Sequence, residues 1–443
     1  MEILVLGVVV LFIIIATVKF KMHPIFSLTI AAVVSGFLLG ITPQNIMSTM
    51  AEGFGKTLSG IGLVIAFGTV IGVYLERTGS TQVLANSVLK IIGLKHSPLA
   101  MNLAGFVISI PVYCDSGYII LSSLNKAISK RTGIPALVFA IALATGLYSA
   151  HVFVPPTPGP LAAAAILGAD LGMVLIFGLL VAIPVSVSGY FWARFIGKSL
   201  KETETENLEK ETRQEQEVIP TTIRPFQAFL PLLVPIVLIA MNSVVNYPTH
   251  PLGEGSLYKI FDFIGSPVIA LLIGVFFAFA LGRNVPSKTR KDWVPDAFKQ
   301  AGAIVLITGA GGAFGAILRT MDIASIINLE STTGVGGLLI AFVIATILKT
   351  AQGSSTVAII TTSAIIAPLL ETFGLLSITD KAFAVLAVGA GAMTVSHIND
   401  SYFWVVSQFS NMNVKTALRG HTMGTLVQGI IGILMILLLY TIV

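Results

Sequence analysis

Long runs of residues without a charged side chain restrict the folding of this chain more than any other feature. Residues 132–169 and 171–193 contain no Lys, Arg, Asp or Glu, and similar runs recur in both halves. A helix needs about 20 largely apolar residues to span a bilayer. Only 11% of the residues are charged, whereas a soluble domain has about 25%. The sequence therefore predicts an all-α polytopic membrane protein and excludes a cytosolic enzyme, a disordered chain and a secreted disulfide scaffold.

The basic residues indicate how the chain crosses the bilayer, because cytoplasmic loops of membrane proteins are enriched in Lys and Arg. With the loop at 19–23 in the cytoplasm, all but five of the 26 Lys and Arg residues fall on that side. The five exceptions are Lys56, Lys259, Arg319, Lys349 and Lys381. We therefore expect a multi-pass inner-membrane protein with both termini outside and its central linker in the cytoplasm. The net charge of +5 reflects this topology, and no nucleic-acid partner is expected.

A hydrophilic linker divides the chain into two halves with related patterns. A G-x-x-x-G pair at Gly68 and Gly72 in the first half matches Gly311 and Gly315 in the second, and a Leu follows three residues later in both. This spacing lets helix backbones approach closely in a membrane, and internal repeats are common in secondary transporters. We predict two repeats of inverted topology. They span residues 1–197 and 225–443, on either side of the linker at 198–224.

Each half has two polar interruptions of an apolar run, at 110–117 and 151–160 in the first half and at 349–356 and 396–401 in the second. Irregular backbone at membrane depth is tolerated only inside protein or beside a water-filled cavity. The N-termini of half-helices offer free N–H groups and a positive dipole end to an anion. We expect the four interruptions to meet and bind a small anion. The predicted re-entrant hairpins span about 98–130 and 335–370, and the predicted broken helices span about 133–168 and 382–410.

Asp115 is an acid in an otherwise charge-free stretch, where a charge is costly unless it is paired, hydrated or protonated. Because burial favours the neutral carboxyl, Asp115 could take up a proton outside and release it inside; the alternative is a cap on the following half-helix. His397 and Asp400 form a second titratable cluster, and His151 occupies the matching break of the first half. We therefore regard Asp115, His397 and Asp400 as proton-coupling candidates.

Serine, threonine and amide side chains at the interruptions are suited to hydrogen-bonding a polyhydroxylated substrate, although serines also cap helices. Lys349 could pair with a substrate carboxylate or extend to the outer interface. A metal site is rejected because too few ligands have helical spacing and Cys114 is the only cysteine. No cofactor is expected. The candidate substrate-binding residues are Asp115, Ser116, Gly117, His151, Thr157, Gly159, Lys349, Gln352, Gly353, Ser354, Ser355, Thr356, His397, Asn399 and Asp400.

At these interruptions the sequence resembles the gluconate permease family of proton symporters, within a broader ion-transporter superfamily. The strings that carry the resemblance are KFKMHP at 19–24, VPPTPGP at 154–160, TGAGGAFG at 308–315, QGSSTVA at 352–358 and SHINDS at 396–401. Members of the family carry gluconate and related sugar acids and, in one branch, D-serine. The resemblance implies a homodimer with a scaffold and a mobile transport domain that moves as an elevator. Many relatives have an apolar residue between the acid and the glycine of the first hairpin, where this chain has Ser116.

We therefore expect a proton-coupled secondary transporter that imports gluconate or a related small sugar acid. A carrier of glycerate or D-serine on the same fold is the alternative, and an ion exchanger fits the hydroxyl-rich tips less well. An intramembrane enzyme is not expected, because the sequence has neither a G-x-S-x-G nor an H-E-x-x-H motif. The expected partners are the small anion, protons, the lipid bilayer and a second copy of the chain.

Overall fold

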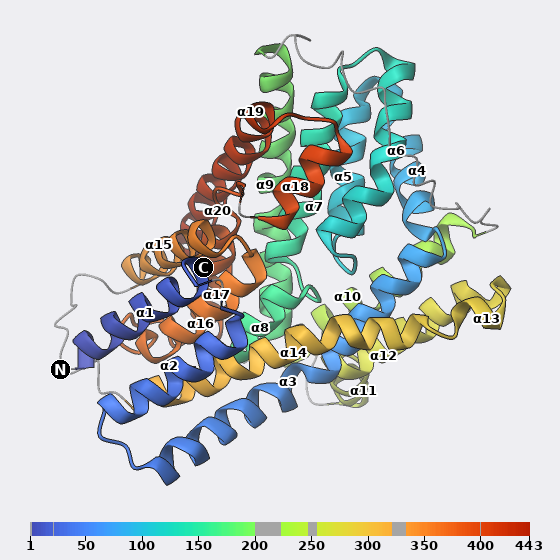
Figure 1. Cartoon of the computed structure of the whole chain (residues 1–443). Coiled ribbons are helices and arrows are strands. Elements are labelled where there is room, and N and C mark those ends of the chain that lie inside the picture. Colours follow the sequence, from blue (N-terminus) through green and yellow to red (C-terminus); the bar gives the residue numbers. More distant parts are fainter. Residues whose placement is uncertain (1, 21, 200–222, 247–254, 321–333, 399) are drawn as a thin grey trace.

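The computed structural model describes residues 2–20, 22–199, 223–246, 255–320, 334–398 and 400–443, and every regular element in these ranges is a helix (Figure 1). Seven of the described helices are long and apolar enough to cross a membrane, or nine if each sharply bent pair is one span. The predicted all-α fold is thus confirmed over the described residues. Asn399 and most of the linker at 198–224 lie outside them.

The first half contributes nine α-helices. They are α1 (Glu2–Val18), α2 (Pro24–Leu38), α3 (Pro43–Arg77), α4 (Ser80–Ile92), α5 (Ser97–Ile108), α6 (Cys114–Thr132), α7 (Ala136–Phe153), α8 (Pro158–Leu167) and α9 (Leu171–Ser199), with a 3₁₀ turn at Leu94–His96. Prolines begin several of these helices, including α2, α3 and α8. Proline suits the first helical position because its fixed φ is already helical and its missing N–H would have no partner there.

The described residues of the second half form eleven α-helices. They are α10 (Pro225–Val245), α11 (Ser256–Ile264), α12 (Pro267–Leu281), α13 (Ser287–Arg290), α14 (Trp293–Leu318), α15 (Val335–Gln352), α16 (Ser355–Ile366), α17 (Ile378–Met393), α18 (Ser401–Phe409), α19 (Val414–Ala417) and α20 (Met423–Ile442). Short 3₁₀ turns lie at Gly282–Asn284 and Ala367–Leu369, and a π-helical turn lies at Leu418–Thr422.

Helices α3 and α14 lie side by side and join the two halves (Figure 1). Their backbones approach so closely that a methyl group on Gly53 would lie 2.6 Å from the Gly312 carbonyl oxygen. At their ends, Arg77 donates to Asp296 at 2.6 Å, and both side chains are partly exposed. The glycines at Gly53 and Gly312 therefore permit the close approach of the α3 and α14 backbones, as G-x-x-x-G patterns do between membrane helices.

The predicted G-x-x-x-G pairs pack mainly against other elements. A methyl group on Gly72 would lie 2.4 Å from the Pro111 carbonyl oxygen, which belongs to the connection between α5 and α6. Gly315 lies against Ala364 of α16. Each glycine pair thus brings α3 or α14 against one of the interrupted segments that surround the candidate site.

Candidate functional site

The described helices break within all four polar segments that the sequence singles out. The connections are 109–113 between α5 and α6, 154–157 between α7 and α8, 353–354 between α15 and α16, and 394–400 between α17 and α18. The helices that follow the breaks pack across the two halves, because α6 contacts α18 and α8 contacts α16. The interrupted segments of the two halves therefore lie against each other.

A buried ion pair lies at the second-half breaks. Lys349 Nζ, in the last turn of α15, donates to Asp400 Oδ2 at 2.5 Å, and the Lys349 side chain is fully buried. Ser396 Oγ donates to the same carboxylate oxygen at 2.5 Å, and the Tyr402 N–H donates to Oδ1 at 3.0 Å. Asp400 is thus the N-cap of α18 and the counter-ion of Lys349. The sequence leaves two possibilities for Lys349, a partner for a substrate carboxylate or a side chain that extends to the outer interface. The second is not observed, because the side chain is fully buried.

Asp115 is the second residue of α6 and is half-buried. Its Oδ1 has no hydrogen-bond partner among the described residues, and the N-terminus of α6 has no side-chain cap. A cap by Asp115 on helix α6, which is the alternative to proton binding, is therefore not observed. The Asp115 and Asp400 carboxylates are close enough to repel each other, so the acids of the two halves lie in the same region. Asp400 has a cation beside it, whereas Asp115 has no such partner among the described ion pairs.

His151, in the last turn of α7, also lies in this region. Its ring stacks on Tyr148 with centroids 6.5 Å apart, its Nδ1 has no hydrogen-bond partner among the described residues, and it interacts electrostatically with Asp400. Both amide atoms of Gln352, at the end of α15, are equally unsatisfied within the described structure. Buried polar atoms usually have partners. The unsatisfied atoms on three predicted site residues, Asp115, His151 and Gln352, are therefore open to a hydrogen bond from water or a polar ligand.

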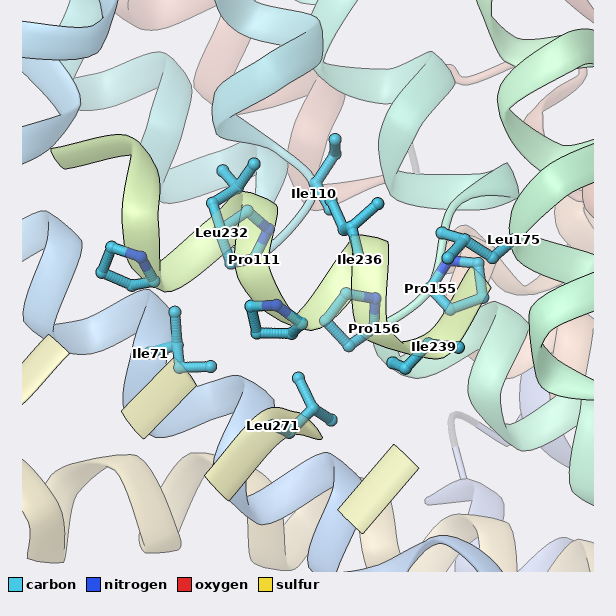
Figure 2. Close-up of a pocket in the computed structure, with 12 residues that line it drawn as sticks. Ile71, Ile110, Pro111, Pro155, Pro156, Leu175, Leu232, Ile236, Ile239 and Leu271 are labelled. Atoms are coloured by element: carbon cyan, nitrogen blue, oxygen red, sulfur yellow. The ribbon is translucent and has the colours of Figure 1, made fainter. Parts of the chain in front are cut away.

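A small hollow opens between α3 and the first-half breaks. Its polar lining comes from Thr69, Tyr113, His151 and Thr157, and Pro158 at the start of α8 lies at its edge. The α8 N-terminus has no side-chain cap hydrogen bond. A neighbouring pocket is lined only by proline, isoleucine and leucine side chains, including Pro111, Pro155 and Pro156 (Figure 2). The polar hollow is the better site for an anion, because the apolar pocket offers no donor side chain.

Several other predicted residues have local structural roles. Gly117 and Gly159 lie against Leu147 and Ile359, where a methyl group would be 2.7 Å and 2.8 Å from the neighbouring side chain. Thr157 donates to the Val154 carbonyl. Gly353 ends α15 with φ of 82°, a left-handed conformation that favours glycine.

Some of the predicted polar residues of the second half cap their own helix, and others contact residues of other segments. Ser354 caps α16. Ser355 lies beside Tyr148, and His397 Nε2 lies 3.0 Å from the Thr350 carbonyl. Ser116 and Thr356 are half-buried in the first turns of α6 and α16.

Sequence reasoning missed His421. This residue is fully buried, and its Nε2 lies 3.2 Å from Ser396 Oγ, one hydrogen bond from Asp400. The available signal was a titratable residue at the start of the last apolar run, two residues after the basic Arg419. That signal carries no information about which distant residue it meets.

The fold and the paired half-helix termini define a helical membrane transporter. The structure is similar to that of the YdaH transporter of Alcanivorax borkumensis, with a TM-score of 0.62 and 16% identity over 89% of this chain and 87% of that chain. The chain belongs to the GntP permease family: the family described as GntP family permease matches residues 1–443. It is 30% identical to a gluconate permease of Pseudomonas aeruginosa, over 98% of this chain and 96% of that protein. It is 31% identical to the D-serine transporter DsdX of Escherichia coli, over 96% of this chain and 95% of that protein. The protein is therefore a transporter and not an enzyme.

Proposed function

We propose that the protein imports gluconate or a related small sugar acid across the inner membrane together with protons. Membership of the permease family supports transport, and the name of the Pseudomonas aeruginosa relative supports gluconate as the first substrate to test. The observation that carries the coupling is the buried pair of Lys349 and Asp400. The pair holds one cation at the site and balances it with an acid that can bind a proton.

The coupling follows from competition for Lys349. A substrate carboxylate that pairs with Lys349 displaces the Asp400 carboxylate, which is then buried without its cation. Breaking a buried pair in this way costs about 3–5 kcal/mol. Protonation of Asp400 removes that cost, because the neutral carboxyl needs no cation beside it. Because such linkage is reciprocal, the bound anion favours the proton and the bound proton favours the anion.

The remaining site groups orient the substrate. The uncapped N-termini of α6 and α8 present free N–H groups and positive dipole ends to a carboxylate or hydroxyl. The unsatisfied atoms of His151 and Gln352 hydrogen-bond the hydroxyl groups of the sugar chain. Asp115 acts as a second acid, since its negative charge repels an incoming anion and its protonation removes the repulsion.

Transport requires the site to open to each side in turn. We assign the two halves to inverted repeats and the movement to an elevator, in which the interrupted segments move past α3 and α14 in each subunit of a homodimer. The contacts of Gly72 with Pro111 and of Gly315 with Ala364 support this assignment, because small residues at these points let the two layers pass closely. Both termini lie outside in this arrangement, and the linker is cytoplasmic.

D-serine is the second candidate substrate, and one observation favours it. Asp115 is an acid with no cation beside it among the described ion pairs, so it offers a partner for the ammonium group of an amino acid whose carboxylate pairs with Lys349. The carboxylate of glycerate would pair with Lys349, but glycerate has no ammonium group to pair with Asp115. An ion exchanger would leave Gln352 and the hydroxyl-bearing breaks without a role.

The test is uptake of labelled gluconate into proteoliposomes with and without an inward proton gradient, with glycerate and D-serine as competitors. We expect the gradient to drive accumulation by the wild type. We expect Asp400→Asn to retain gluconate exchange and lose accumulation, because its amide still caps α18 but cannot ionise. Equal accumulation of gluconate with and without the proton gradient would reject proton coupling. Movement of a competitor but not of gluconate would reject the substrate and keep the mechanism.

A further inference from the structure

A buried histidine near the ion pair is not used by the mechanism above. His421 lies in the π-helical turn Leu418–Thr422 that begins the last membrane helix, and its side chain is fully buried. Single π-helical turns are rare and frequently mark functional sites. Two residues earlier, Arg419 is exposed. The chain thus runs from the buried His421 to an exposed basic residue on the side that the sequence predicts to be cytoplasmic.

The hydrogen bonds from His421 to Asp400 form a continuous chain. Ser396 Oγ donates its only proton to Asp400 Oδ2 at 2.5 Å. His421 Nε2, 3.2 Å from the same hydroxyl, must therefore be the donor to Ser396. The Ser396 backbone is fixed as well, because its N–H donates to Thr425 Oγ1 and its carbonyl accepts from Thr422 Oγ1. The serine is consequently held between the histidine and the acid.

The other ring nitrogen of His421 is open. Its buried Nδ1 has no hydrogen-bond partner among the described residues, which is unusual for a buried polar atom. The charged groups that act on the ring are Asp400 and Lys349, and Tyr402 of α18 packs edge-on at 5.3 Å. From α7 and α9, Ile141 and Trp192 contact the adjacent Gly420.

We propose that His421 passes the coupling proton between Asp400 and the cytoplasmic side through Ser396, an inference that rests on the proposed function. For release, His421 starts as the Nδ1–H tautomer with a bare Nε2. Protonated Asp400 gives its proton to Ser396 Oγ while the Ser396 proton passes to His421 Nε2, and the imidazolium so formed gives its Nδ1 proton to water on the cytoplasmic side. One proton leaves, Asp400 becomes a carboxylate, and the proton is left on Nε2, which is the state described here. Before the next release the ring exchanges its Nε2 proton, through water, for one on Nδ1.

The experiment compares wild type, His421→Gln and Ser396→Ala in proteoliposomes with labelled gluconate and an internal pH dye. The exposed His96 provides a matched control, His96→Gln. Loss of a positioned acid–base group typically slows proton transfer about 10²–10⁴-fold. We expect proton-driven accumulation by His421→Gln to slow at least about 100-fold, while gluconate exchange, which needs no net proton movement, stays within twofold. His96→Gln should match the wild type in both assays.

The outcomes separate this inference from the proposed function. A wild type that does not accumulate gluconate with a proton gradient overturns both. A coupled wild type together with a coupled His421→Gln overturns the relay alone. If His421→Gln loses exchange as well, Ser396→Ala is the deciding variant. Exchange without accumulation by Ser396→Ala supports the relay, and normal accumulation by Ser396→Ala rejects it. A shift in the pH dependence of accumulation, absent in His96→Gln, distinguishes proton transfer from a packing role.

Discussion

Removing one charge of the Lys349–Asp400 pair should destabilise the protein much more than removing both. Lys349 is fully buried and the Asp400 side chain is only 5% exposed. In Lys349→Met the carboxylate is left without a cation, and in Asp400→Asn the ammonium is left without an anion. Each single change should cost about 3–5 kcal/mol. The double variant should lie close to the wild type, because replacing a whole buried pair is often nearly neutral.

The chain provides its own reporter for this measurement. Cys114, the only cysteine of the sequence, is buried at the start of α6, so a thiol-reactive fluorogenic dye reports unfolding in detergent without further mutation. Unfolding midpoints of the wild type, both single variants and the double variant are compared at one heating rate.

A partly exposed ion pair serves as the matched control. The Arg77 and Asp296 side chains are 35% and 43% exposed, and such pairs contribute about 0.2–1 kcal/mol. Arg77→Met and Asp296→Asn should therefore lower the midpoint only slightly. A Lys349→Met/Asp400→Asn double variant as unstable as the sum of its single variants would refute the reasoning, since the two charges would then not compensate each other.

Three further predictions concern packing and ligand contacts. Gly72→Val should destabilise the fold by about 1–3 kcal/mol through overpacking against the Pro111 carbonyl; Gly60→Val on the same helix, where a methyl group meets nothing within 4 Å, is the control in the dye assay. Asp115→Asn should tighten gluconate binding on the order of tenfold at alkaline pH, as measured by equilibrium binding across pH, and an unchanged affinity would exclude charge repulsion. Gln352→Ala should weaken gluconate binding by about 0.5–1.5 kcal/mol with an unchanged unfolding midpoint, because the lost hydrogen bonds are made to the ligand.

The helix breaks could be read from the sequence because their causes are local. The four prolines within residues 155–160 cannot all lie in one continuous α-helix, since each lacks an N–H and clashes with the preceding turn. Gly353 and the serines that follow supply a helix end and a cap over a few residues. The charge-free runs likewise predict helices from composition alone. These signals give the positions of α6, α8, α16 and α18.

The partners within the site could not be predicted, because they depend on how distant segments pack. Lys349 and Asp400 are far apart along the chain and belong to different interrupted segments, so no periodicity relates them. His421 contacts Ser396 from within a π-helical turn that no residue pattern in the chain indicates. His397, a predicted member of the cluster, has its Nε2 3.0 Å from the Thr350 carbonyl, a partner in another segment that no sequence pattern indicates.

The most direct test of the central claim is the proton gradient that halts net gluconate movement. Proteoliposomes are loaded to a fixed gluconate ratio with the membrane potential clamped at zero, and the external pH is varied until the net flux stops. One proton per carboxylate predicts that a gluconate ratio of about 100 is balanced by a gradient of about two pH units, because each tenfold ratio equals about 1.4 kcal/mol. A net flux that follows the gluconate ratio at every pH difference would contradict the exchange of partners at Lys349 and Asp400.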